Sequence, residues 1–181
     1  MKKTNSMCIL FGVGLLLCSI PSCSGHSTGN DNRQNSAANT EVTLKDYGME
    51  PTVLDIDAYT MANTNFRVVL WTGNNLQVVL MSIPVGGEVG LEQHPNTEQF
   101  LRIESGEAKV LMGDEKEHLT FEQSAEKDFA IFVPAGKWHN IINTGNEPLK
   151  LYSIYSPVEH PHGTIHKTFE EAEEAEALMH Q

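Results

Sequence analysis

Residues 86–106 read GGEVGLEQHPNTEQFLRIESG and hold several side chains that can bind a metal or transfer a proton. Glu92 and His94 are two positions apart, and on a β-strand that spacing places both side chains on one face. A Pro-Asn pair then interrupts the strand, and Glu98 opens the next apolar run. This order predicts an imidazole and two carboxylates close together where two strands meet.

A second segment, PAGKWHNIIN at residues 134–143, supplies another histidine. His139 follows a Pro-x-Gly turn, which can deliver the start of a strand into the same barrel mouth. Two imidazoles and two carboxylates together suit Mn²⁺, Fe²⁺, Zn²⁺ or Ni²⁺. The three cysteines, Cys8, Cys18 and Cys23, all precede this region, so histidine and carboxylate side chains remain as its ligands.

Short apolar runs, separated by turn residues, follow one another from residue 67 to residue 155. They are rich in valine, isoleucine, leucine and phenylalanine, no helix-length amphipathic pattern interrupts them, and they predict an all-β sandwich or barrel. Residues 52–58 and 63–66 fit a strand, a turn or a short helix. The expected strands are Arg67–Trp71, Leu76–Ile83, Gln99–Glu104, Glu107–Met112, Phe129–Val133, Trp138–Asn143 and Leu149–Tyr155.

The two ends of the chain differ from this pattern. A short apolar run, Met7–Ile20, follows two lysines near the N-terminus, which is the layout of a secretory signal. It ends in Ile-Pro-Ser-Cys23, which resembles the lipobox of bacterial lipoproteins, and the alternative is an ordinary signal peptide cut nearby. At the other end, Phe169–Met179 is acidic and made of helix-forming residues, so we expect a short, solvated acidic helix.

Four segments are therefore expected along the 181 residues. They are a signal peptide (1–22), a flexible tether rich in serine and asparagine (23–45), a barrel (46–167) and an acidic helix or tail (168–181). The net charge of −12 and the lack of a basic run argue against a nucleic-acid partner. We expect an exported protein, anchored by lipid at Cys23 on the periplasmic or cell-surface side of a membrane.

The two quoted segments resemble the two motifs of the cupin superfamily, and of small one-domain bacterial cupins in particular. The first motif has Gly, five residues, His-x-His, three or four residues, Glu and a later Gly. The second has Pro-x-Gly, two residues, His, three residues and Asn. The resemblance implies a double-stranded β-helix (jelly-roll) barrel with one divalent metal ion, and it places metal ligands at His94, Glu98 and His139.

Three positions depart from the cupin motifs. Glu92 stands where the first motif usually has His, so it is a candidate fourth ligand or a group that accepts a hydrogen bond from a metal-bound water. The gap from Glu98 to Gly106 is one residue longer than usual, which predicts a wider turn at its end. Asp128 stands where the second motif usually begins with Gly, and aspartate tolerates turn conformations.

The resemblance leaves two functions open, because one fold hosts many activities. One is a metal-dependent enzyme with oxygenase- or isomerase-type chemistry on a small organic metabolite, with Glu92 or a nearby carboxylate as general base. The other is a non-catalytic lipoprotein that binds a metal or a ligand at the cell surface. Either function is compatible with a homodimer. We expect His160, His162 and His166 to be exposed to solvent, on a closing segment that crosses the outside of the barrel. The alternative is that they form a second set of polar groups at the barrel mouth.

Lipid labelling tests the predicted anchor. Cells given labelled fatty acid should label the unaltered protein, and Cys23→Ala should abolish the label because the acylated thiol is gone. Cys18→Ala, which lies in the segment removed by cleavage, should leave the label unchanged. A protein that takes up no label and partitions as a soluble species would contradict the anchor.

Overall fold

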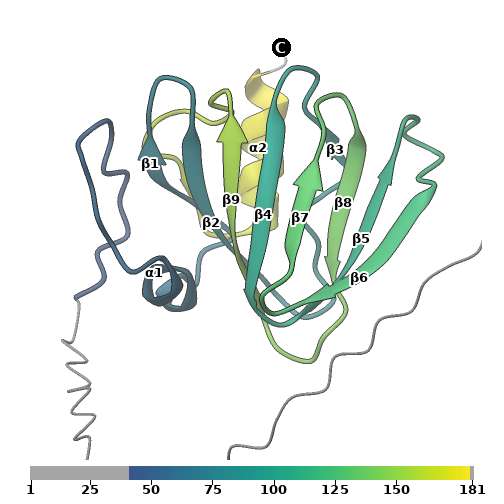
Figure 1. Cartoon of the computed structure of the whole chain (residues 1–181), viewed down its shortest axis with the longest axis horizontal. Coiled ribbons are helices and arrows are strands. Elements are labelled where there is room, and N and C mark those ends of the chain that lie inside the picture. Colours follow the sequence, from purple (N-terminus) through teal and green to yellow (C-terminus); the bar gives the residue numbers. More distant parts are fainter. Residues whose placement is uncertain (1–40, 180–181) are drawn as a thin grey trace, which may run out of the picture. The chain divides into compact units, whose positions relative to one another are not determined.

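The computed structural model describes residues 41–179, which form two antiparallel sheets (Figure 1). The strand order is β10-β1-β2-β9-β4-β7 in the larger sheet and β3-β8-β5-β6 in the smaller one. All seven expected strands are present, each within one residue at either end, and the all-β prediction is confirmed. The strands are β1 (Arg67–Thr72), β2 (Gln77–Ile83), β3 (Glu92–Gln93), β4 (Glu98–Ser105), β5 (Glu107–Gly113), β6 (Phe121–Glu126), β7 (Ala130–Val133), β8 (Trp138–Asn143), β9 (Leu149–Ser156) and β10 (Ile165–His166).

The strands β6 and β10 and the helix α1 (Ile56–Ala62) were not predicted from the sequence. β6 is an edge strand in which Ala125 alone is buried, so it has no apolar run to show. α1 covers the last three residues of the ambiguous stretch 52–58, and the stretch before it is irregular. The Asp55 side chain caps the helix by accepting a hydrogen bond from the Ala58 N–H at 3.2 Å. The predicted signal peptide, Cys23 and residues 24–40 lie outside the described residues.

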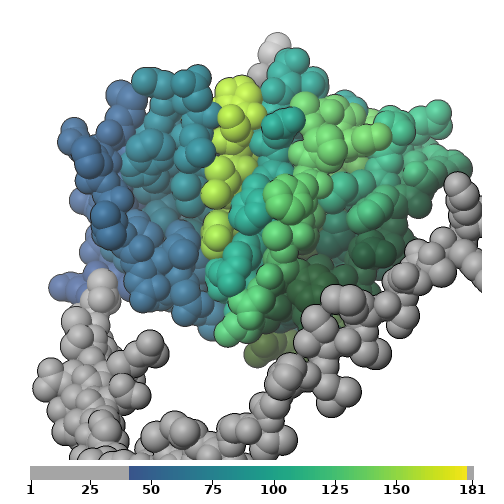
Figure 2. Space-filling view, viewed as in Figure 1, coloured from purple at the N-terminus to yellow at the C-terminus, as the bar shows by residue number. Residues whose placement is uncertain are grey.

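α1 packs on the outer face of the larger sheet. Tyr59 of α1 is buried against Val68, Leu70 and Leu80, which point outward from β1 and β2. Residues 42 and 44, in the segment predicted as a tether, pack on the same cluster. Figure 2 shows the rest of this face as open surface, with β9 running as a strip between β2 and β4.

The space between the sheets is apolar at one end and polar at the other. At the apolar end, Ile83 of β2 pairs with Leu149 of β9, and both side chains are fully buried. Six residues towards the other end of β9, Tyr155 pairs with Gln77 on one side and Gln99 on the other, and all three are buried. The apolar end provides the hydrophobic core, so the polar end is free to carry groups that are costly to bury.

α2 (Phe169–Met179) is the predicted acidic helix, and one side of it is packed rather than solvated. Ala172 is buried in the core, and the Phe169 ring meets Phe66 edge to face at 5.5 Å. A side chain at Gly90 would come within 3.2 Å of Phe169, and the backbone there has φ +108°, so glycine is required. In Figure 1 the helix lies behind β9 and β4. Within residues 41–179 no helix is long and apolar enough to cross a membrane.

Candidate metal centre

Three of the four predicted ligands come together at the polar end of the barrel. β3 pairs with β8 so that Glu92 lies opposite His139, and side chains at opposed positions project to one face. His94, two positions after Glu92, returns to that face. The Oε1 atom of Glu92 lies 3.2 Å from Nε2 of His94 and 3.3 Å from Nε2 of His139.

The other ring nitrogens of both histidines already have acceptors. The Nδ1–H of His139 donates to the carbonyl oxygen of Lys137 at 3.0 Å, and Nδ1 of His94 lies 3.0 Å from Oε1 of Glu159. In neutral imidazoles these contacts fix the proton on Nδ1 and leave a lone pair on each Nε2. In that tautomer two lone pairs and a carboxylate oxygen face one another, and a metal ion or a proton between them makes the arrangement favourable.

Charges around this group follow from its contacts. Burial would raise the pKa of Glu92, but its contacts with the imidazoles of His139 and His94 outweigh burial and hold that pKa well below its usual range. Burial would lower the pKa of His94, but the carboxylates of Glu159 and Glu92 raise it to about 9. Without a metal, a proton on His94 therefore supplies the positive charge that the group needs.

The fourth predicted ligand, Glu98, does not join the group. Its side chain is exposed on the outer face of β4, whereas its neighbour Gln99 points inward and is buried. Nε2 of Gln99 donates to Ser153 Oγ at 3.0 Å and to the Tyr155 hydroxyl at 2.8 Å. The Oε1 atom of Gln99 is buried without a hydrogen-bond partner among the described residues, which makes it a candidate metal ligand.

One signal in the sequence identifies Gln99. Counting to Gly106 gives the usual spacing from Gln99, whereas the count from Glu98 is one residue too long. The burial alternation of β4 agrees, because Gln99, Leu101 and Ile103 are buried on the inner face. The count therefore makes Gln99 the candidate for the ligand position of the motif, and the register of β4 against β9 also shifts between Ile103 and Ser105, just before the turn.

One histidine of the segment 160–166, His160, is buried, although we expected it to be exposed to solvent. His160 is 6% exposed, and its backbone N–H and carbonyl both bond to the side chain of Gln77, at 2.9 and 2.8 Å. Its ring packs edge to face against Tyr155 at 5.1 Å, and its Nε2 has no partner among the described residues. The expectation is wrong for His160 because the clamp from Gln77 turns the segment inward. His162 remains exposed, and His166 is half-buried with a buried Nδ1.

A buried arginine also reaches the group. Arg67 of β1 is 1% exposed, and its Nη2 lies 3.9 Å from Oε2 of Glu92. Its Nη1 donates to Oε1 of Glu176 at 2.6 Å, which ties α2 to the barrel interior. Nothing in the local sequence marked Arg67, because only the pairing of β1 with β2 and the placement of α2 bring these residues together.

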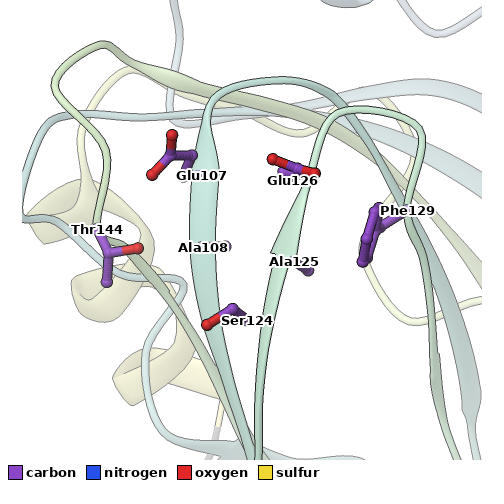
Figure 3. A pocket seen from close by; sticks show the side chains of 7 residues that line it. All are labelled: Glu107, Ala108, Ser124, Ala125, Glu126, Phe129 and Thr144. Carbon is purple, nitrogen blue, oxygen red and sulfur yellow. The ribbon is translucent and has the colours of Figure 1, made fainter.

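A separate hollow of about 260 Å³ lies at the other end of the β5–β8 pair (Figure 3). Ala108 there pairs with Asn143, whereas Met112 pairs with His139. No histidine lines the hollow, so it does not match a transition-metal centre. Its lining residues are Glu107, Ala108, Ser124, Ala125, Glu126, Phe129 and Thr144.

Comparison with known sequences agrees with this geometry. The sequence profile of the cupin domain matches residues 79–155, which include all the candidate ligands. This chain belongs to the cupin superfamily.

Relatives of this cupin are close in sequence and in structure. The uncharacterized protein YrkC of Bacillus subtilis is 53% identical over 143 residues, which are 79% of this chain and 77% of YrkC. Protein L612 of Acanthamoeba polyphaga mimivirus is 40% identical over 116 residues, 62% of this chain and 69% of L612. The crystal structure of BH2720 from Bacillus halodurans is 52% identical, with a TM-score of 0.72 over 72% of this chain and 99% of BH2720.

Metal content of purified variants tests the ligand set. The cupin should bind about one divalent ion per chain. The double change His94→Ala, His139→Ala should remove it, because both nitrogen ligands are lost. Gln99→Leu should weaken binding by about tenfold or more, whereas Gln99→Glu should keep or strengthen it. Elemental analysis after dialysis measures each occupancy.

Two exposed positions serve as controls for that experiment. Glu98→Gln, on the outer face, and His118→Ala should both leave the metal content unchanged. Metal lost from Glu98→Gln but retained by Gln99→Leu would return the ligand role to Glu98. Metal that survives the double histidine change would refute the centre.

The raised pKa of His94 predicts how the stability of the metal-free protein depends on pH. Its pKa is about 9 in the fold against a reference of 6.5. Protonated His94 thus stabilises the fold fully below pH 6.5, and the contribution is lost as the pH rises through 9. Across that window the unfolding free energy of chelator-treated protein should fall by up to about 1.4 kcal/mol per pH unit. Its melting temperature should fall accordingly. His94→Gln should flatten the profile, and a flat profile in the unaltered protein would count against the raised pKa.

Proposed function

We propose that this cupin is a metal-dependent enzyme that acts on a small organic metabolite by oxygenase- or isomerase-type chemistry. The observation that carries the proposal is the convergence of Nε2 of His94, Nε2 of His139 and the Glu92 carboxylate in a largely buried position. Such a group needs a positive charge at its centre, and a divalent metal ion would supply it in place of the proton on His94. Mn²⁺, Fe²⁺, Zn²⁺ and Ni²⁺ remain the candidates, since two imidazoles and oxygen donors suit each of them.

The charge of the proposed ligand set favours catalysis. Two carboxylate ligands, as the sequence suggested, would neutralise a dication. With Gln99 in place of Glu98, Glu92 is the one carboxylate in the set, so the metal and its direct ligands together keep net positive charge. A bound dication would therefore supply stronger Lewis acidity, or redox chemistry, to an organic ligand.

Glu92 is better suited to hold the metal than to act as general base. A base needs a pKa near the working pH, whereas hydrogen bonding holds the pKa of Glu92 well below its usual range. Glu159 has a positioning role, because its contact with Nδ1 of His94 sets the orientation of that ring. We assign Glu92 to the metal and Glu159 to its support.

The cellular setting is part of the proposal. The signal-like residues 1–22 and Cys23 support an exported lipoprotein, with the barrel on the periplasmic or cell-surface side of the membrane. The acidic composition supports a small-molecule partner rather than a nucleic acid. A homodimer is compatible with this setting.

A metabolite screen followed by turnover assays separates an enzyme from a binding protein. A ligand that raises the melting temperature of the metal-loaded protein, and not of the chelator-treated protein, identifies the compound to follow. An enzyme should convert it in molar excess over protein, as measured by mass spectrometry. Glu92→Gln should alter metal occupancy and turnover together, whereas Glu98→Gln should alter neither. Recovery of the ligand unchanged would favour the alternative, a non-catalytic binding lipoprotein.

A further inference from the structure

We propose that Arg67 and His160 form a subsite beside the metal centre for the carboxylate of a small organic acid. This inference rests on the proposed function, because it names the class of metabolite that the same site would take. Two buried nitrogen atoms outside the proposed ligand set carry it, Nε of Arg67 and Nε2 of His160. Neither has a hydrogen-bond partner among the described residues, and a buried donor without an acceptor is costly.

Arg67 points into the barrel, directly against the metal centre. It lies on the same face of β1 as Val69, which belongs to the core between the sheets. One end of its guanidinium is used by Glu176, and the other lies 3.9 Å from Glu92. The Nε–H has no acceptor among the described residues, and Nη2 at 3.9 Å is too far from Glu92 for a hydrogen bond. Nε and Nη2 therefore form a fork that matches the two oxygens of a carboxylate.

The ring of Tyr155 connects His160 with the metal centre. The Tyr155 ring meets His94 edge to face at 5.5 Å and His160 edge to face at 5.1 Å. The residue before His160, Glu159, contacts His94 directly. Because the Gln77 side chain clamps the backbone of His160 on both sides, the imidazole is held in place before any ligand arrives.

The ring of His160 is neutral at this position. Burial, and then the charge of Arg67, lower its pKa to about 3. A neutral imidazole keeps one N–H, so it can donate to a ligand oxygen without adding a charge. Arg67 would therefore supply the charge that attracts the ligand, and His160 a neutral donor that orients it.

The charge balance of the site favours a monoanion over a dianion. A dication and Arg67 together match the three nearby carboxylates of Glu92, Glu159 and Glu176, so the site is near neutral before a ligand binds. A carboxylate adds a single negative charge, whereas a phosphate dianion adds two to a buried site. Desolvation and repulsion therefore favour the carboxylate.

Titration calorimetry with defined probes tests the subsite. The probes are acetate, pyruvate and malonate, with pyruvamide as an uncharged control and inorganic phosphate as the other oxyanion. Each is titrated into metal-loaded and chelator-treated protein, and the metal content of every sample is measured first. We expect at least one carboxylate to bind at about 10 mM or below, more tightly than pyruvamide and phosphate.

Three variants separate a subsite from a structural ion pair. Arg67→Lys keeps the charge but loses the fork, and His160→Phe keeps the ring against Tyr155 but loses the nitrogen. Each should weaken carboxylate binding about tenfold with metal content retained. Glu176→Gln breaks the same ion pair from the other side and releases Nη1 of Arg67, so it should tighten carboxylate binding.

The outcomes that overturn the inference differ from those that overturn the proposed function. Metal-loaded protein that binds none of the three carboxylates, or binds them equally well after Arg67→Lys and His160→Phe, refutes the subsite and leaves the metal site intact. Glu176→Gln that weakens binding shows that the ion pair is structural, which also refutes the subsite. Protein that holds no metal refutes the proposed function, and carboxylate binding that still requires His160 in that protein would support the subsite alone.

Discussion

The pairing of β3 with β8 holds Glu92 opposite His139, and the chemistry at the polar end of the barrel depends on that contact. β3 has only two residues, but β8 is fixed on its other side by six residue pairs with β5, so the short strand meets a rigid partner. The two strands bring electron-rich atoms together that would repel one another without a cation. A proton on His94 serves in the metal-free protein, and a metal would compete for the same position. Folding, protonation and metal binding are therefore coupled at one place.

The barrel interior has an apolar end and a polar end, and burial at the apolar end offsets the cost of the buried polar groups. The apolar end of the barrel supplies the hydrophobic burial, while the polar end accumulates buried donors and acceptors. Segments outside the main strands complete that polar end. The stretch after β9 contributes Glu159 and His160, and α2 contributes Glu176, which reaches Arg67. The acidic C-terminal helix is therefore a structural part of the site as well as a solvated surface.

The strands were predictable because each buries one face and shows it as a short apolar run. β6 was not predicted because it is an edge strand with little burial. α1 was not predicted because a seven-residue helix is too short to show a periodic pattern. The difference between Glu98 and Gln99 shows a second limit. A carboxylate is the more familiar metal ligand, but the pleat of β4 turns Gln99 inward, and strand alternation outweighs residue type.

By itself, the sequence determined the all-β class, the position of seven strands, the acidic helix and the convergence of Glu92, His94 and His139. These follow from local rules, namely burial alternation along a strand and motif spacing. The tertiary structure alone decided that His160 is buried, that Arg67 lies against Glu92 and that Glu176 reaches inward. Those contacts join residues up to 109 positions apart. No local pattern encodes them, because sheet order and helix docking fix them only after the whole barrel has formed.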